Sequence, residues 1–257
     1  MLATKLLFGE LRMSRWLKAL PLALALAALS IFASSCGSSN ARVRFVHVIQ
    51  DGAAMDIDIN GTQEFTNIAF LGVQPSQPGY TSVPSGSDTI EGFLTDTTTV
   101  GFNSTSIDFN ASQQYTVVAT GFVATGQNAV ILSIPDNLPS PGTDQVEFRV
   151  IHASPSGPGA VDVYILMNPV TAPTGTPTIS ALAYEQASGY VSLAYNPNNV
   201  TNPPGFTVFV TASGGTVPII SEPLNPGVSG AVRTLVLTDV QGGKLMNSTF
   251  LELADLN

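Results

Sequence analysis

The chain has 257 residues, with 9 Lys and Arg against 18 Asp and Glu, a formal net charge of −9, two His and one Cys. An acidic surface repels phosphate backbones, which argues against nucleic acid as a partner, and a single Cys excludes an internal disulfide. Two His in separate parts of the chain do not supply the three or four ligands of a zinc site, so we expect neither a metal nor a cofactor.

The first 35 residues have the features of an export signal in the usual order. Four cationic residues precede an apolar run at 21–33, which ends in small residues before the only Cys, Cys36. The run is shorter than the about 20 residues of a membrane-spanning helix, and this order is typical of a cleaved signal peptide. Without this leader the chain keeps five cationic residues against seventeen acidic ones, and it loses its only Trp, Trp16.

The segment that ends at Cys36 resembles the lipobox of bacterial lipoproteins, in which a Cys is acylated and becomes the amino terminus. The resemblance implies a signal peptide over residues 1–35, lipidation of Cys36 and attachment to a membrane. Gly37 replaces the Asp that retains many lipoproteins in the inner membrane, which implies the outer membrane or cell surface in a cell with two membranes. Ala33 stands where the lipobox usually has Leu, so ordinary signal-peptidase cleavage and an uncleaved anchor stay open, as does a start at Met13.

After a short polar tether at 36–40, the chain has the pattern of an all-β protein. Short runs rich in Val, Ile, Thr, Phe and Tyr alternate with Gly, Pro, Asn and Ser, without an apolar stripe of helical period. This spacing favours β-sandwiches over a parallel sheet. The expected strands are 43–49, 55–59, 115–122 and 129–134, then 148–153, 161–166, 233–240 and 250–253.

One motif occurs twice, about a hundred residues apart, as RVRFVHVIQDGAAMDIDIN at 42–60 and EFRVIHASPSGPGAVDVYI at 147–165. Later segments also correspond, namely PGYTSVPSG with ASGYVSLAYNP, QYTVVATGF with VRTLVLTDV, and ILSIPDN with FLELADLN. Each copy of the motif carries an Arg, a His and an Asp between apolar residues, which are Arg44, His47 and Asp56, and Arg149, His152 and Asp162.

The repeat predicts two copies of one domain, at 41–137 and 145–257, each with its own core. A Pro-rich linker at 138–144 is expected to hold them apart as a short, stiff spacer. The second domain is longer because it carries NPVTAPTGTP after Met167 and NPNNVTNPPG after Tyr195. Loops of this kind at the ends of a sandwich often carry recognition.

The second copy resembles a bacterial family known as domain of unknown function 4397, through R-x-x-H-A-S-P at 149–155, A-V-D-V-Y at 160–164 and G-Y at 189–190. The resemblance extends over both copies, although the first reads HVIQDGAAMDIDI in the same place. It implies exported, immunoglobulin-like domains, so the expected fold is two tandem immunoglobulin-like antiparallel β-sandwich domains after a signal peptide. If the motif binds a ligand, the resemblance implies that the first copy is the one to have lost it.

His47 and His152 are interpreted as structural residues. Period-two counting places His47 on the same strand face as the apolar Phe45, and His152 has the corresponding place in the second copy. Each ring is expected to bond an Asp or a backbone group on the neighbouring strand, with Asp56 and Asp162 as the natural partners. A metal site or a catalytic dyad is the alternative.

The sequence DIDING at 56–61 has two interpretations. It begins like an EF-hand calcium loop, but Asn67 stands where that loop needs a bidentate Glu. As structure, DIDI is an alternating strand, and Asn60-Gly61 is a strong signal for a two-residue hairpin. We predict the hairpin.

Motifs of known catalytic centres are missing from the sequence. No G-x-S-x-G elbow occurs, and Ser154 and Ser156 lack a second His as base. Carboxylate pairs suited to glycoside hydrolysis stay open, because the chain has many acidic residues. Four tyrosines are interpreted as packing residues rather than a sugar-binding platform, and they are Tyr80, Tyr184, Tyr190 and Tyr195.

We therefore expect no catalytic residue, and an exported, lipid-anchored cell-envelope protein that acts as a non-catalytic adhesion, scaffold or protein-binding module. Its expected partners are the membrane, through the lipid anchor, and an envelope protein or glycan. A glycan- or calcium-dependent binding module is the first alternative, and a hydrolase with an unrecognised carboxylate site is the second.

Overall fold

A computed structural model of the protein describes residues 40–123, 129–198, 205–241 and 248–256. The predicted signal peptide and the predicted lipidation site, Cys36, lie outside these residues. The described residues form strands β1 to β17 and no helix, which confirms the all-β prediction. None of them belongs to a helix that is long and apolar enough to cross a membrane. From Ser39 onward the chain forms one compact unit.

Strands β1 to β9 form the first sandwich, which has two sheets. One sheet has the order β4-β1-β8-β9, with β5 beside β4 on the same edge of β1. It contains β4 (Gly72–Gln74), β1 (Asn40–His47), β8 (Gln114–Thr120), β9 (Val130–Pro135) and β5 (Thr81–Pro84). The facing sheet contains, in order, β3 (Thr62–Ile68), β2 (Met55–Ile59), β6 (Gly86–Leu94) and β7 (Val100–Phe109).

Strands β10 to β17 form the second sandwich with the corresponding strand order. Its first sheet contains, in order, β13 (Val191–Ala194), β10 (Gln145–His152), β16 (Val232–Asp239) and β17 (Ser248–Leu256). Its second sheet contains, in order, β12 (Ile179–Ala183), β11 (Ala160–Met167), β14 (Phe206–Ala212) and β15 (Pro218–Leu224).

Each sandwich has one parallel strand pair among its otherwise antiparallel pairs, which the prediction of antiparallel sandwiches did not include. Strand β1 runs parallel to β8, with Arg44 opposite Thr116. Strand β10 runs parallel to β16, with Arg149 opposite Thr234. Because strand order and register are the same in both sandwiches, corresponding residues of the repeated motif occupy corresponding places.

Alternate residues of the strands build one apolar core inside each sandwich. In the first core, Phe45 of β1 packs against Phe65, with ring centroids 6.0 Å apart. In the second core, Phe148 of β10 packs edge-on against Phe206, with centroids 5.6 Å apart. Burial of one such side chain contributes about 1.5–3 kcal/mol, so these rows of apolar residues account for the pairing of the sheets.

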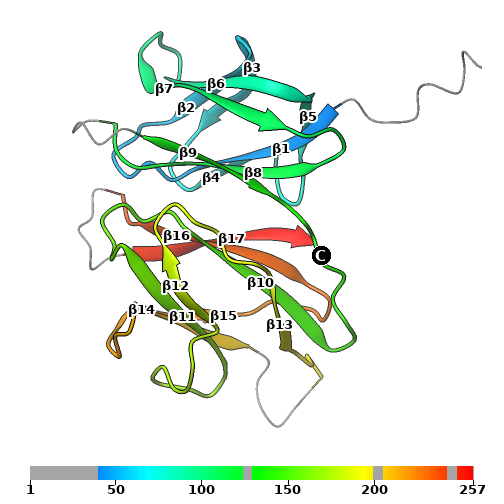
Figure 1. The fold of residues 1–257 in the computed structure, drawn as a ribbon, viewed down its shortest axis with the longest axis vertical. Helices are drawn as coiled ribbons and strands as arrows, with labels where there is room; N and C mark the ends of the chain where they lie inside the picture. Colours follow the sequence, from blue (N-terminus) through cyan, green and yellow to red (C-terminus); the bar gives the residue numbers. More distant parts are fainter. Residues whose placement is uncertain (1–39, 124–128, 199–204, 242–247, 257) are drawn as a thin grey trace, which may run out of the picture. The chain divides into compact units, whose positions relative to one another are not determined.

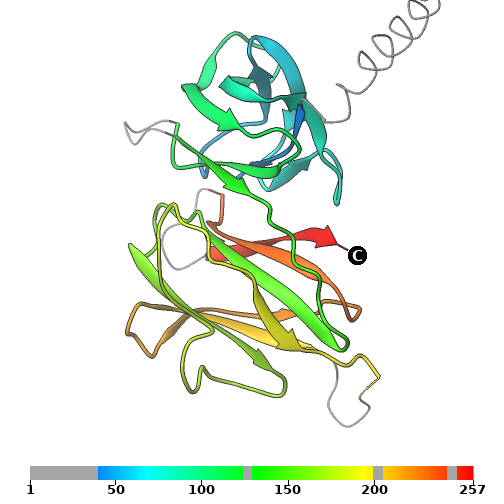
Figure 2. The same ribbon diagram turned by 45° about the vertical axis from the view of Figure 1, so that its right-hand side comes forward.

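A third apolar cluster lies between the two sandwiches. Val46 and Val118, on the outer face of the first sandwich, are fully buried in one cluster with Ile151 and Val236 of the second. The sheet with β1, β8 and β9 therefore packs against the sheet with β10, β16 and β17 (Figures 1 and 2). Residues 138–144 were expected to hold the two domains apart, but the sandwiches are in contact, because these outer faces are apolar and are stabilised by mutual burial.

The turn between β2 and β3 is the predicted two-residue hairpin. Asn60 and Gly61 have φ angles of 53° and 74°, and Ile59 pairs with Thr62. Two consecutive residues with positive φ are the mark of the type I′ turn that Asn-Gly favours. The side chain of Asn60 bonds β6, since its Nδ2 donates to Asp88 Oδ1 at 2.6 Å.

Candidate functional site

The two arginines of the repeated motif lie between the sandwiches, where each pairs with an Asp of the other sandwich. Arg44 of β1 donates from Nη2 to the carboxylate of Asp255, near the end of β17. Arg149 of β10 donates from Nη2 to the carboxylate of Asp136, directly after β9. All four side chains are almost completely buried. Buried charges of this kind are tolerated only when they are paired and hydrogen-bonded.

In each sandwich, one threonine connects the arginine to the Asp of that same sandwich. Thr116 Oγ1 accepts a hydrogen bond from Arg44 Nε at 2.8 Å and donates to Asp136 Oδ2 at 2.7 Å. Thr234 does the same in the second sandwich, with distances of 2.7 and 2.6 Å. The parallel register of the strands causes this arrangement, because it sets each threonine directly opposite its arginine.

Two tyrosines complete the arrangement. The Tyr80 hydroxyl donates to Asp136 Oδ2 at 2.8 Å, and the Tyr80 ring centroid lies 5.3 Å from the guanidinium carbon of Arg44. Tyr190 makes the same two contacts in the second sandwich, at 2.9 and 4.9 Å. We call this set the inter-sandwich network, and it consists of Arg44, Tyr80, Thr116, Asp136, Arg149, Tyr190, Thr234 and Asp255.

The electrostatics of the network keep Arg44, Tyr80 and Tyr190 protonated. Burial by itself lowers the pKa of Arg44, but the negative charges of Asp255 and Asp136 outweigh burial and raise that pKa above its ordinary value. Burial also raises the pKa of both tyrosines, Tyr80 and Tyr190, well above the ordinary value. Both hydroxyls therefore keep their protons and remain donors to the carboxylates.

The histidines of the motif bond loop backbone and not the expected aspartates. His47 Nε2 lies 3.0 Å from the carbonyl oxygen of Ala53, and Nδ1 accepts from the N–H of Ile49 at 3.3 Å. His152 has the same two contacts, with the Pro158 carbonyl at 3.0 Å and the Ser154 N–H at 3.4 Å. The expectation of His–Asp pairs is wrong, because the loop that leaves each first strand folds back onto the ring.

These contacts select a neutral imidazole with its proton on Nε2. Since Nδ1 accepts a hydrogen bond, a second proton there would face another N–H group. Burial lowers the pKa of His47 and of His152, although the hydrogen bonds to the loop carbonyls oppose this effect. The loop needs a glycine at Gly52, because a Cβ atom there would stand 2.8 Å from His47 Cε1.

Asp56 supports the outer sheet of the first sandwich. Its Oδ1 accepts from the N–H of Asn67 at 2.7 Å and from the Thr95 hydroxyl at 3.2 Å, and its Oδ2 accepts from the N–H of Asp96 at 3.3 Å. Asn67 and Asp96 both have positive φ angles, of 50° and 59°. The carboxylate therefore stabilises an irregularity in the β2–β3 pairing and the turn after β6.

Asp162 has the same role in the second sandwich. It accepts from the N–H of Ala181 at 2.7 Å and from the N–H of Gly214 at 2.8 Å, and these residues have φ angles of 50° and 73°. These two hydrogen bonds lower the pKa of Asp162. The repeated Arg, His and Asp thus do not meet in one site, since they act at the interface, the loop and the outer sheet.

A serine lies next to His152, but the two do not form a nucleophile–base pair. The Ser154 hydroxyl donates to Asp239 Oδ1, and its own N–H, not its hydroxyl, contacts the imidazole. Asp239 also accepts from the N–H of Ser156 at 3.0 Å. A nucleophilic serine needs its hydroxyl bonded to the base and open to substrate, whereas Ser154 is 1% exposed.

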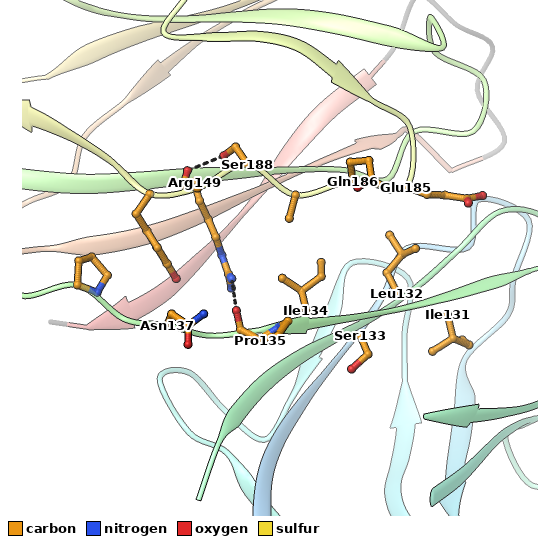
Figure 3. A pocket seen from close by; sticks show the side chains of 14 residues that line it. Ile131, Leu132, Ser133, Ile134, Pro135, Asn137, Arg149, Glu185, Gln186 and Ser188 are labelled. Carbon is orange, nitrogen blue, oxygen red and sulfur yellow. Dashed lines mark hydrogen bonds between the residues drawn. The ribbon is translucent and has the colours of Figure 1, made fainter. Parts of the chain in front are cut away.

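A groove lies beside the network, at the junction of the sandwiches. It has a volume of about 680 Å³. Residues 131–135 of β9 form one wall and residues 185–190 form the other, with Asn137 and Arg149 at one end (Figure 3). We call it the junction groove. Its lining combines apolar side chains such as Leu132 and Ile134 with nearly as many polar ones, a mixed composition that suits a binding site.

A second hollow, of about 320 Å³, lies in the first sandwich beside the β2–β3 hairpin. Asp56, Asp58 and Phe93 are among the residues that line it. The oxygens of Asp56 already accept three hydrogen bonds, which leaves this hollow less suited to a cation. Among the described residues, no group of three or more His, Cys, Asp or Glu side chains is placed to hold a metal ion.

The remaining candidates from the sequence have separate locations. Tyr195 is buried in the second core, 6.0 Å from the ring centroid of Phe206, and Tyr184 packs edge-on against His152 at 5.7 Å. Residues 199–204 of the second predicted recognition loop lie outside the described part of the chain. Four residues of the network were not predicted from the sequence, although all fall in segments that correspond between the copies, namely Asp136, Asp255, Thr116 and Thr234.

A comparison with known families finds a match to part of the chain. Residues 41–164 match the model of a family described as Domain of unknown function (DUF4397). The match covers the first sandwich and ends within β11, so it includes both occurrences of the Arg, His and Asp motif. Among curated proteins, none matches the chain. The resemblance inferred from the sequence is confirmed over this span, because residues 41–164 match the model of the family that the repeated motif resembles.

Proposed function

We propose that this is an exported, lipid-anchored cell-envelope protein whose two sandwiches form a rigid, non-catalytic module that binds another protein in the junction groove. The observation that carries the proposal is the groove, a hollow of about 680 Å³ between two sandwiches that buried ion pairs hold together. Pre-formed concave surfaces of mixed apolar and polar character are the usual form of a binding site.

The buried network supports a role in binding, because it fixes the two walls of the groove. Arg149 belongs to the network and also lines the groove, where its Nη1 donates to the carbonyl of Pro135 at 3.2 Å. A wall held by several hydrogen bonds loses little conformational freedom when a partner binds, which favours affinity. The proposal of an envelope location rests on the leader and on Cys36 in the sequence.

The alternatives receive less support from the arrangement of side chains. A hydrolase needs carboxylates that substrate and water reach, whereas the side chains of Asp136 and Asp255 are 0% exposed and bonded to arginine, threonine and tyrosine. A glycan- or calcium-dependent module would use the hollow beside Asp56 and Asp58, in which the first carboxylate already serves the protein.

Capture of envelope proteins by the protein and two matched variants tests the proposal. Gly189→Arg puts a long side chain into the groove, and Gly159→Arg puts the same side chain on the surface elsewhere. A Cβ atom at either position meets no other atom within 4 Å, so both variants should fold. We expect a specific envelope protein to bind the wild type and Gly159→Arg and not Gly189→Arg. Equal capture by all three would refute the proposed site.

A further inference from the structure

The junction groove runs along β9, which is an open edge strand. The sheet order β4-β1-β8-β9 ends at β9, and among the described strands β9 pairs only with β8. The N–H of Asp136 donates to the carbonyl of Gln114, the first residue of β8. Because main-chain groups alternate in direction along a strand, the even-numbered residues of β9 face β8. Ile131, Ser133 and Pro135 therefore direct their main-chain groups away from β8.

One end of this outward row already has a partner. The carbonyl of Pro135 accepts from Arg149 Nη1, and proline has no N–H to donate. The N–H and C=O groups of Ile131 and Ser133 continue the row along the groove, and no described strand pairs with them. Donors and acceptors at every second residue are the pattern that an extended polypeptide matches.

The corresponding edge in the second sandwich shows how such a position is covered. Ala254 of β17 corresponds to Pro135, since they pair with Arg233 and Tyr115 at equivalent places. The N–H of Ala254 donates to Oε1 of Gln77, at 2.5 Å. Gln77 belongs to the segment between β4 and β5 of the first sandwich. Its side-chain oxygen accepts the outward N–H of β17, as the main-chain carbonyl of an added strand would do in strand addition.

The side chains around the groove indicate which segment fits. Leu132 and Ile134 point from β9 toward residues 185–190 (Figure 3). In a strand added to β9, every second side chain would point in the same direction as Leu132 and Ile134, into the space next to Ala187. This position favours apolar side chains at alternate residues of the added strand. Glu185 lies at one end of the opposite wall, and its carboxylate favours a Lys or Arg in the segment.

We infer that β9 binds an extended segment of a partner protein by strand addition. The segment has apolar side chains at alternate positions and a basic residue near Glu185. Its main chain bonds Ile131 and Ser133. This inference rests on the proposed function and deepens it, because it names the class of partner and the strand that receives it.

The direct test uses a synthetic peptide as the probe. It has about seven residues, the length of a typical strand, with alternating Val and Thr, a Lys near one end, blocked termini and a fluorophore. Its binding to the full chain in detergent is measured by fluorescence anisotropy. A second peptide with N-methyl groups on alternate amides has the same side chains and lacks the donors on one edge.

Two substitutions at one residue separate the main chain from the side chain. Ser133→Pro removes the outward N–H, and Ser133→Ala keeps it. Proline is tolerated on an edge strand where the N–H faces away from the neighbour, and Pro135 occupies such a position two residues later. We expect at least about tenfold weaker peptide binding for Ser133→Pro, as for the loss of a main-chain hydrogen bond and a close contact. Ser133→Ala should bind like the wild type.

Several results would overturn the inference. These are no binding of the peptide to the wild type, equal binding by Ser133→Pro and Ser133→Ala, or equal binding of the two peptides. The peptide comparison remains valid if Ser133→Pro fails to fold. A dimer that Ser133→Pro dissociates in sedimentation would assign β9 to a second copy of the chain and would also overturn it.

The outcome distinguishes this inference from the proposed function. If Gly189→Arg abolishes capture of the envelope partner and Ser133→Pro does not, the groove binds its partner without strand addition, and only the inference fails. If neither variant changes capture, both the inference and the proposed site fail.

Discussion

The guanidinium of Arg44 reaches the carboxylate of Asp255, which lies 211 positions further along the chain. Arg149 reaches back to Asp136, so each sandwich supplies the counter-charge of the other. Two copies of the same outer face thus meet as an isologous pair, in the manner of a symmetric dimer interface. This arrangement gives a physical reason for an arginine that occurs twice, because each copy supplies one arginine and one aspartate to the shared network.

Neutralising Asp136 should destabilise the protein strongly. Asp136→Asn keeps the shape of the side chain but leaves Arg149 buried without a full counter-charge, and breaking a buried pair costs about 3–5 kcal/mol. Glu252→Gln is the matched control, since Glu252 pairs with Arg233 at 3.1 Å and its side chain is 41% exposed. An exposed pair contributes about 0–1 kcal/mol. Urea unfolding measures both free energies, and equal losses would contradict the interpretation of the network.

The two sandwiches should unfold together. They share the third apolar cluster and exchange ion pairs, so we expect one cooperative transition in calorimetry. After proteolytic cleavage within residues 138–144, the two fragments should elute as one complex. Two separate transitions, or fragments that part after cleavage, would show that the sandwiches are independent, as the sequence suggested.

Local features of the fold were predictable from the sequence because short-range chemistry determines them. The Asn60-Gly61 turn has its own conformational preference. The alternation of side chains along a strand correctly predicted that His47 is buried, since its exposed fraction is 0%. The partner of His47 was not predictable, because the carboxylate of the expected Asp56 bonds β3 and the turn after β6 instead. The actual partner, the Ala53 carbonyl, depends on how the intervening loop folds.

The interface was not predictable in the same way, because it depends on how two sandwiches dock. The signal that was present is the acidic residue at the end of each copy, in SIPDN and ELADLN. A repeated Asp at the end of a last strand, together with a repeated Arg in a buried first strand, indicates a conserved contact between strands of one sheet. It does not indicate that the Arg of one copy contacts the Asp of the other.

Stability should fall as the pH drops below about 6.5, the ordinary pKa of histidine. Burial lowers the pKa of His47 and His152 in the folded protein. At pH values between these lowered pKa values and 6.5, the two histidines therefore bind more protons in the unfolded chain than in the folded protein. The contribution of the two rings to the free energy of unfolding is therefore present above this window and is lost within it as the pH falls.

Urea unfolding between about pH 7.5 and pH 5.5 measures this dependence. The double variant His47→Gln, His152→Gln provides the control, because glutamine does not titrate. It should be less stable than the wild type at the higher pH and should show a flatter pH dependence. Each single variant, His47→Gln or His152→Gln, should remove part of the slope, because burial lowers the pKa of both rings. An unchanged slope in the double variant would contradict neutral, buried rings.

Substitutions of His152 and Asp162 should act independently, since the two side chains have different hydrogen-bond partners. Each loss of a buried hydrogen-bonding group costs about 1–3 kcal/mol. The double variant His152→Ala, Asp162→Ala should therefore lose the sum of the single losses to within about 0.5 kcal/mol. Asp136→Asn and Arg149→Met, which remove partners of one ion pair, should instead show strong coupling in the same measurement. Coupling between His152 and Asp162 of similar size would restore the pair expected from the sequence.

Replacement of Cys36 tests the proposed lipid anchor. If Cys36 is acylated, Cys36→Ala should move the protein from the membrane fraction to the soluble fraction, because the signal peptide then has no lipidated residue to expose. Ala33→Leu is the matched control, since it brings the segment closer to the lipobox and should keep or increase membrane attachment. The unfolding midpoint of the soluble protein should not change, because Cys36 precedes the first strand. Mass spectrometry of the amino terminus identifies the modification. A Cys36→Ala protein that stays in the membrane with its leader intact would instead identify the segment as an uncleaved anchor.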